Sequence, residues 1–305
     1  MIERTGTYHW PVMVSEVLES LGVHPGGTYI DCTLGDGGHA VAVLEAANAD
    51  GARPGPRGRV LGLDADPEAI VATTERLHDY GDAAIIVNSN FDQLEDVATS
   101  NGFVPADGVL FDLGLSTRQL DSEGRGFSFR RPGALDMRFA AEGNLTADQI
   151  VNEWPEEELA DLIYEFGEER RSRRIAKAIV RERPIHDAQR LAEVVARSSG
   201  YRNGRTHPAT RTFQAIRIKV NHEIDSLKAG LDQAVKVLGA GGRLVTIAYH
   251  SLEDREIKRF VGRSDDMRPV QRKVIKPSKA EVDRNPRSRS AKLRVVERQA
   301  TESDT

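Results

Sequence analysis

Residues 28–47 read TYIDCTLGDGGHAVAVLEAA, which combines a strand, a glycine-rich turn and a helix in that order. Residues 28–34 are rich in the side chains that favour strands, and the run AVAVLEAA after the turn favours a helix. Glycines let the backbone approach a ligand closely, and the first N–H groups of a helix have no partner within it. The stretch therefore predicts a ligand-binding turn between a strand and a helix.

The same alternation of strand and helix recurs along the chain. We expect further strands at residues 59–67, 83–91, 107–115 and 239–250. Helices are expected after the second and the fifth strand, at 67–80 and 251–261. Alternating strands and helices of this length are typical of a parallel sheet with helices on both faces, so the fold class is α/β with a mostly parallel sheet.

Residues 116–213 interrupt this pattern, because they contain no convincing strand. The segment 154–183 predicts two helices that break near Gly167, and 187–198 predicts another. A long helical stretch at 212–238 then leads back to the fifth strand. We therefore predict an inserted all-α domain at 116–213 within a discontinuous α/β domain of residues 1–115 and 214–305.

Composition excludes several classes of protein. The chain has 305 residues, 39% of them hydrophobic and 29% charged, which is enough apolar material for a buried core. A single cysteine, Cys32, excludes a disulfide framework and argues against a cysteine zinc site. The apolar runs are too short to cross a bilayer, and the N-terminal residues do not have the pattern of a signal peptide. We expect a soluble, cytoplasmic protein that does not associate with a membrane.

The net charge of -5 conceals an uneven distribution along the chain. Residues 1–113 contain 5 Lys and Arg against 18 Asp and Glu, whereas residues 255–298 contain 15 against 6. A basic C-terminal arm of this kind can neutralise phosphates, although a solvated surface is the alternative. The negative net charge of the whole chain therefore does not exclude a nucleic-acid partner.

The acidic residues near the glycine turn indicate which cofactor it binds. Asp31, Asp36 and Asp64 would repel a pyrophosphate, but they would attract a cationic sulfonium that carries an amino group. Asp64 closes the second strand, where a carboxylate can accept hydrogen bonds from both ribose hydroxyls. S-adenosyl-L-methionine therefore fits the turn better than a nicotinamide dinucleotide does.

Long strings of residues resemble one family, the MraW family of bacterial ribosomal RNA small subunit methyltransferases H. The resemblance runs almost from end to end and is specific, because the strings are long and unusual. They are HWPV at 9–12, GDGGHA at 35–40, GLDADPEAI at 62–70, DGVLFDLGLSTRQLD at 107–121, RGFSFR at 125–130, LDMRF at 135–139, FGEERRSRRIAKAIV at 166–180, HPATRTFQAIRIKVN at 207–221, YHSLEDR at 249–255 and NPRSRSAKLR at 285–294.

The resemblance implies a Rossmann-like class I methyltransferase fold with an inserted helical domain. It implies an enzyme that methylates the exocyclic N4 amine of a cytidine in the decoding region of 16S rRNA within the small ribosomal subunit. It also implies the residues that contact S-adenosyl-L-methionine: Gly37, Gly38, His39, Asp64, Phe91, Asp112 and Gln119. An isolated phenylalanine such as Phe91 is, as an alternative, a core residue.

Asp112 is the best-placed candidate for catalysis, because it ends the fourth strand at the edge where parallel sheets bind ligands. The exocyclic amine of cytosine is a poor nucleophile, so an acceptor for its proton would assist the transfer. The methyl donor is already activated, so we expect no metal. The alternative for Asp112 is that it caps the next element.

Several residues are candidates for binding the substrate. Tyr249, His250 and Ser251 follow the fifth strand and are expected to line the same crevice, although His250 could equally be a hydrogen-bonding residue at the strand end. His9, Arg211, Arg287 and Arg289 complete the set. We expect the helical insertion and the basic arm to carry the RNA, and removal of residues 284–305 to weaken RNA binding while sparing cofactor binding. The assembly is expected to be a monomer or a homodimer.

Two rival functions remain open. One is a methyltransferase that acts on a small molecule or a protein, and the basic arm and helical insertion argue against a small acceptor. The other is a non-catalytic RNA-binding module with a relic cofactor fold, against which the intact Asp64, Asp112 and glycine turn argue.

Overall fold

The computed structural model describes residues 11–49, 57–122, 124–130, 133–140, 145–200 and 207–300. The chain divides into two compact units, which we call the sheet unit (Met1–Ser116 and Ile224–Thr305) and the helical unit (Thr117–Glu223). None of the helices in the described ranges is both long and apolar enough to cross a membrane.

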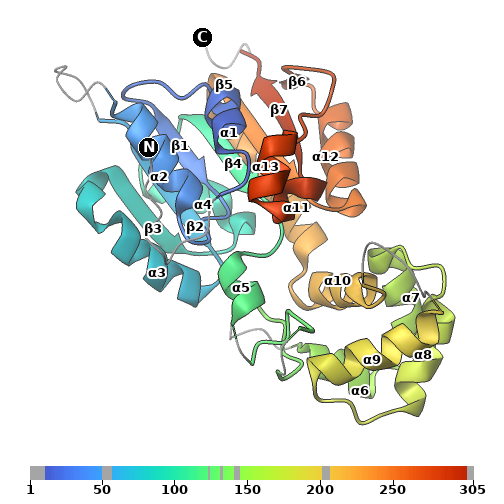
Figure 1. The fold of residues 1–305 in the computed structure, drawn as a ribbon. Helices are drawn as coiled ribbons and strands as arrows, with labels where there is room; N and C mark the ends of the chain where they lie inside the picture. Colours follow the sequence, from blue (N-terminus) through green and yellow to red (C-terminus); the bar gives the residue numbers. More distant parts are fainter. Residues whose placement is uncertain are drawn as a thin grey trace. The chain divides into compact units, whose positions relative to one another are not determined.

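A seven-stranded sheet with the order β3-β2-β1-β4-β5-β7-β6 forms the centre of the sheet unit (Figure 1). The neighbours among β1 to β5 pair in parallel, and β7 pairs antiparallel with both β5 and β6. The strands are β1 (Thr28–Asp31), β2 (Arg59–Asp64), β3 (Ala84–Asn88), β4 (Ala106–Asp112), β5 (Leu238–Ala248), β6 (Met267–Pro269) and β7 (Lys292–Arg298). This arrangement confirms the predicted mostly parallel, Rossmann-like α/β sheet.

Helices cover both faces of the sheet and bury two separate apolar clusters. One cluster joins α1 (Val14–Leu21), α2 (Gly38–Ala47) and α3 (Pro67–Leu77) to one face. The other joins α4 (Leu94–Ser100), α11 (Glu223–Val237) and α12 (Ser251–Arg263) to the opposite face. Because both faces are covered, the parallel strands are almost continuously apolar, as in RVLGLD of β2.

The helical unit consists of α5 (Thr117–Asp121), α6 (Ala147–Glu153), α7 (Glu156–Gly167), α8 (Ser172–Arg181), α9 (Ala188–Ser199) and α10 (Thr210–Val220). Helix α7 ends at Gly167 as expected, and Glu168 follows as its C-cap with a φ of 48°. Glycine is required at position 167, because a Cβ there would lie 2.7 Å from the carbonyl oxygen of Arg211. Within the described part of this unit, β pairing is limited to an isolated bridge between Ala134 and Asp187.

The return to the sheet unit differs from the expectation. We expected the α/β domain to resume at residue 214, but α10 belongs to the helical unit and the boundary follows Glu223. The stretch expected as one long helix is also two helices, since Asn221 ends α10 and His222 adopts a φ of 52°. The Asn221 side chain donates to the Met137 carbonyl and accepts from the Phe139 N–H, which fixes the break.

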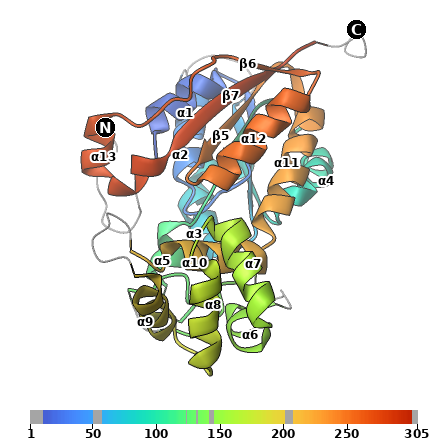
Figure 2. The ribbon, with the colours of Figure 1, turned by 90° about the vertical axis from the view of Figure 1, so that its right-hand side faces the viewer.

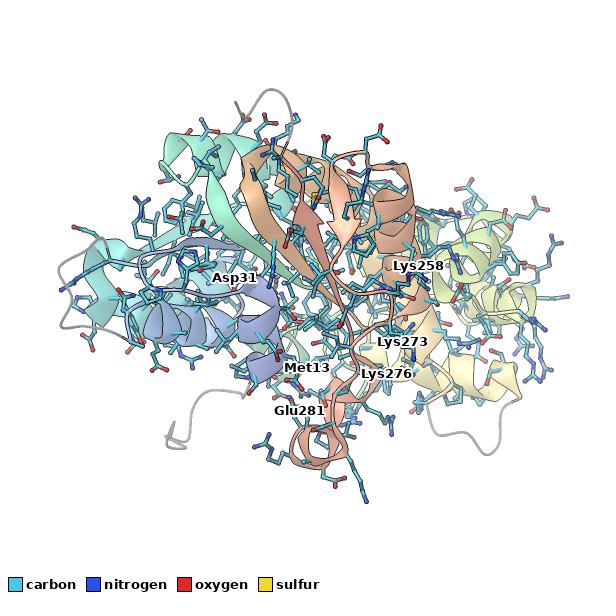
Figure 3. The ribbon with its side chains drawn as sticks, turned by 90° about the horizontal axis from the view of Figure 1, so that it is seen from above. Met13, Asp31, Lys258, Lys273, Lys276 and Glu281 are labelled. Atoms are coloured by element: carbon cyan, nitrogen blue, oxygen red, sulfur yellow. The ribbon has the colours of Figure 1, made fainter. Side chains whose placement is uncertain are left out.

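The basic C-terminal segment is part of the fold rather than a separate arm. β7 lies between β5 and β6 (Figure 2). Its residues Leu293, Val295 and Val296 are at least 96% buried. Helix α13 (Lys279–Arg284) precedes it, and Glu281 there accepts a hydrogen bond from the N–H of Met13 at 3.3 Å; both residues are labelled in Figure 3. The segment therefore joins both the sheet and the N-terminal part of the sheet unit.

Removing residues 284–305 is consequently expected to unfold the sheet unit, contrary to our expectation that cofactor binding would survive. The truncation exposes one side of β5 and removes the buried side chains of β7 from both clusters. Thermal unfolding followed by circular dichroism should show no cooperative transition. A shorter truncation of 299–305, which keeps β7, is the control, and a cooperative transition in the long truncation would contradict the prediction.

Candidate cofactor site

Three aspartates end three neighbouring parallel strands. Asp31 is the last residue of β1, Asp64 the last of β2 and Asp112 the last of β4. These strands are adjacent in the sheet, so the three carboxylates gather at one edge. The carboxyl edge of a parallel sheet is where such folds bind ligands.

The glycine loop between β1 and α2 is held in place from both sides. The Gly35 N–H donates to Asp64 Oδ2 at 2.8 Å, and Thr73 Oγ1 of α3 donates to the Gly35 carbonyl at 2.7 Å. Gly37 has a φ of 72°, and a Cβ there would lie 2.7 Å from Thr73 Cγ2. Both observations require glycine at position 37, so the backbone can pass close to α3 and present the start of α2 to a ligand.

Asp64 is fixed by backbone donors. Its Oδ2 accepts from the Gly35 N–H and its Oδ1 accepts from the Asp66 N–H, each at 2.8 Å. Burial raises its pKa to about 6 in spite of these donors, which favour the charged form. A ligand that donates hydrogen bonds to this carboxylate would compensate the cost of keeping it ionised.

Asp31 has an unused buried oxygen. Asp31 is 4% exposed, and its Oδ1 accepts a hydrogen bond from the Thr33 N–H at 3.1 Å. Oδ2 has no hydrogen-bond partner among the described residues. Burial raises the pKa of Asp31 to about 6, and the nearby charge of Asp112 adds to that rise. An unpaired buried carboxylate oxygen beside further carboxylates suits a cationic or hydrogen-bond-donating ligand.

Asp112 connects two aromatic side chains from opposite parts of the sheet unit. The Tyr249 hydroxyl donates to Asp112 Oδ1 at 2.8 Å, and His39 Nε2 lies 3.4 Å from Oδ2. Burial and the Asp112 charge raise the pKa of Tyr249 well above its usual value, so the phenol keeps its proton. Burial acts to lower the pKa of His39, but Asp112 and Asp31 outweigh it and raise the value.

Tyr249 and His250 are held by the first turn of α12. Glu253 Oε2 accepts the N–H of Tyr249 at 2.8 Å and that of His250 at 3.1 Å. His250 is the N-cap of α12, and its Nδ1 accepts the Glu253 N–H at 3.4 Å, while Nε2 lies 3.0 Å from Glu253 Oε1. Of the two interpretations, the structure gives His250 the hydrogen-bonding role at the strand end. A role for His250 or Ser251 in binding substrate stays a prediction.

The remaining predicted residues lie in several places. Phe91 is half-buried against Phe111, with ring centroids 5.3 Å apart, so it belongs partly to the core, and contact with an adenine stays a prediction. Arg287 and Arg289 are exposed on a short 3-10 helix, Pro286–Ser290, before β7. His9 lies outside the described residues.

Gln119 and Arg211 belong to the helical unit. Gln119 is buried on α5. Arg211 Nη1 on α10 donates to the Glu168 carbonyl at 3.1 Å and lies 3.9 Å from Glu169 Oε2. The cofactor contact of Gln119 and the substrate contact of Arg211 stay predictions.

Three residues that were not predicted from the sequence support the site. Thr33 Oγ1 accepts the N–H of Asp112 at 2.6 Å, Thr73 anchors the glycine loop, and Glu253 fixes the strand end that carries Tyr249. Only Glu253 had a usable signal, because it lies three residues after the helix N-cap, where a glutamate completes a capping box.

The helical unit has a basic hollow of its own. It has a volume of about 470 Å³ and is lined by Asp161, Tyr164, Arg170, Arg171, Ser172, Arg173 and Arg174. Tyr164 is 63% exposed. The backbone N–H of Arg171 donates to Glu169 Oε1 at 2.9 Å. Within the described residues the side chains of Arg170, Arg173 and Arg174 form no ion pair, so the hollow offers positive charge.

Comparison with known proteins identifies the family. A profile described as the MraW methylase family matches residues 6–299. The chain belongs to this family. A relative from Dehalococcoides mccartyi, named Ribosomal RNA small subunit methyltransferase H, is 48% identical over 308 residues, which cover 95% of this chain and 86% of the relative.

A relative of the same name from Thermomicrobium roseum is 46% identical over 313 residues, covering 96% of this chain and 94% of the relative. An rRNA methylase structure from Streptococcus thermophilus aligns with a TM-score of 0.46 and 11% identity over 97% of this chain and 100% of that one, which adds nothing to the family assignment. Membership confirms the predicted methyltransferase and its cofactor, S-adenosyl-L-methionine.

The raised pKa values predict how stability depends on pH. Burial raises the folded-state pKa of Asp31 and Asp64 from 3.8 to about 6, so their contribution to stability is complete below pH ~4 and is lost as the pH rises through 6. Urea unfolding of the ligand-free protein should show a loss of about 2–3 kcal/mol per carboxyl over that window. Asp31→Asn should remove about half of this dependence.

Asp225→Asn, which changes an aspartate with an 80% exposed side chain, is the control and should keep the dependence of the parent protein. If the free energy of unfolding of the parent protein instead rises steadily from pH 4 to 7, the pKa values of Asp31 and Asp64 are not raised in the folded state.

Proposed function

We propose that the chain transfers a methyl group from S-adenosyl-L-methionine to the exocyclic N4 amine of a cytidine in the decoding region of 16S rRNA. The observation that carries the proposal is the position of Asp112, which lies at the carboxyl edge of the sheet between His39 and Tyr249 and next to the acidic cofactor site. The names of the relatives, which refer to rRNA of the small ribosomal subunit, support the substrate class.

The cofactor is held by groups of the sheet unit. Asp64 is the acceptor for the ribose hydroxyls, the loop at Gly37 and Gly38 provides close backbone contact, and Asp31 and Asp112 favour the positive charge. When bound, S-adenosyl-L-methionine supplies a methyl group that its sulfonium already activates. The protein therefore needs neither a metal nor a covalent nucleophile.

The main task of the protein is to position a weak nucleophile. Delocalisation into the cytosine ring lowers the nucleophilicity of the amine, and fixing two reactants in line lowers a barrier by roughly 7–11 kcal/mol. Asp112 accepts a hydrogen bond from the amine N–H. This bond orients the nitrogen lone pair and polarises the N–H bond, so that the electron density on nitrogen rises. Tyr249 and His39 hold the Asp112 carboxylate in the required orientation. The target base leaves its stack to reach this edge.

The substrate is carried by the basic surfaces. In the helical unit these are the arginine-lined hollow and Arg211, and in the sheet unit they are Arg287 and Arg289 with the residues after β5. His9 is included by resemblance. A cytoplasmic location and a monomeric or homodimeric state belong to the same proposal.

Transfer of a tritiated methyl group, followed by nucleoside analysis of the product, tests the proposal. The assay uses assembled small subunits, free rRNA and bulk protein as separate acceptors. We expect label in N4-methylated cytidine from the small-subunit or rRNA acceptor and none in protein. Label in protein, or in another nucleoside, would favour a rival methyltransferase function.

Asp112→Asn should lower the turnover number at least 100-fold, because an amide lacks the charge that polarises the amine. Asp107→Asn is the matched control: Asp107 lies near the opposite end of β4 and accepts the N–H of Thr28 at 2.7 Å. Near-normal turnover in Asp112→Asn, with unchanged cofactor affinity by calorimetry, would remove Asp112 from the reaction.

A further inference from the structure

Asp254 of α12 is surrounded by three cations. Lys258 Nζ lies 2.8 Å from Oδ2, Lys292 Nζ lies 3.4 Å from the same oxygen, and Arg294 Nε donates to Oδ1 at 2.8 Å. The Asp254 side chain is only 7% exposed, whereas that of Lys258 is 56% exposed and that of Lys292 is 34% exposed. One buried carboxylate thus holds three cations, whose side chains are 20% to 56% exposed.

Two more lysines extend this group. Ile275 and Leu293 form an isolated antiparallel bridge through two backbone hydrogen bonds, which brings residues 273–276 alongside the start of β7. Lys273 and Lys276 in this segment are exposed and form no ion pair with any described residue. Figure 3 shows Lys258, Lys273 and Lys276 following one another on one side of the sheet unit. We call the three cations at Asp254, which are Lys258, Lys292 and Arg294, together with the neighbouring Lys273 and Lys276 the Asp254 cluster.

The cluster lies beside the cofactor edge. Lys292 pairs with Ala248, the last residue of β5, and Tyr249 follows directly. Asp254 follows Glu253, whose carboxylate holds the N–H groups of Tyr249 and His250. The cations therefore stand within the same unit and at the same end of the sheet as Asp112.

The positive charge of the cluster exceeds the single negative charge of Asp254. Burial acts to raise the pKa of Asp254, but Lys258, Arg294 and Lys292 outweigh it and lower the pKa to about 2. One cation would be enough to neutralise this carboxylate, and further cations at the same oxygen atoms repel one another. An arrangement of this kind is stabilised by an added anion, and a row of exposed lysines fits several phosphates in sequence.

We propose that the Asp254 cluster binds the phosphodiester backbone of the substrate strand next to the target nucleotide. The proposal rests on the proposed function only in taking RNA as the substrate. Asp254 orients the cations and does not touch the RNA. Backbone contacts fix the register of a strand without reading its sequence, so the cluster sets which nucleotide reaches the carboxyl edge.

The experiment measures the affinity for a short unstructured RNA oligonucleotide by fluorescence anisotropy at several salt concentrations. Two double variants test the cluster: Lys258→Gln with Lys292→Gln, and Lys273→Gln with Lys276→Gln. We expect each to weaken binding about 10-fold or more at low salt. The slope of log affinity against log salt should become shallower by about 0.7 for each lost contact.

The matched control is Lys236→Gln with Arg263→Gln. Lys236 and Arg263 lie in the last turns of α11 and α12, each paired with one carboxylate at 2.6 Å, and both are more than half exposed. Calorimetry with S-adenosyl-L-methionine and thermal unfolding check that all variants are folded. The pair Lys273 and Lys276 makes no ion pair within the described chain, so its replacement removes no stabilising contact of that kind.

Equal effects of the control and the cluster variants, or an unchanged slope in both cluster variants, would overturn the proposal. Failure of the proposed function gives a different result. If the parent protein methylates no cytidine but the cluster variants still lose RNA affinity, the cluster stands and the reaction is wrong. If methylation of cytidine proceeds with parent kinetics and parent affinity in both cluster variants, the cluster is wrong and the reaction stands.

Discussion

The burial of carboxylates at adjacent strand ends is the constraint on which the site depends. Asp31, Asp64 and Asp112 end neighbouring strands, and burial raises the pKa of the first two to about 6. Such an arrangement costs folding free energy in the absence of a ligand, and a cation that binds there recovers part of that cost. The preference of the site for a positively charged sulfonium cofactor thus follows from the order of the strands and from the aspartate that ends each of them.

The surrounding elements hold this acidic edge in place. Helix α3 fixes the glycine loop through Thr73, and the first turn of α12 fixes Tyr249 through Glu253. The next residue of α12, Asp254, gathers the cations of β7 and α12. Two consecutive residues of α12 thus serve both sides: Glu253 fixes the strand end beside the acidic edge, and Asp254 gathers the cations of the basic side. This arrangement explains why a net charge of -5 for the chain is compatible with an RNA substrate.

The local sequence pattern predicted the parallel strands, because apolar runs that end in aspartate can be recognised in the sequence alone. It missed β7, since KLRVVER alternates cations with apolar residues and its charge suggested a solvated arm. The break between α10 and α11 depends on the contacts of Asn221 with Met137 and Phe139, more than 80 residues earlier in the chain. Thr33 and Thr73 act through hydrogen bonds that exist only after folding. Asp112 and Tyr249 were each predicted, but their contact was not.

Titration calorimetry of S-adenosyl-L-methionine in buffers of different ionisation enthalpy tests the central claim most directly. If the cofactor binds the ionised form of Asp31 and Asp64, binding near pH 6 must release protons, because each carboxyl is about half protonated beforehand. The observed enthalpy should then vary with the buffer at pH 6, with about one proton released, and this dependence should vanish by pH ~8. An enthalpy that is independent of the buffer at pH 6, or proton uptake on binding, would contradict the account.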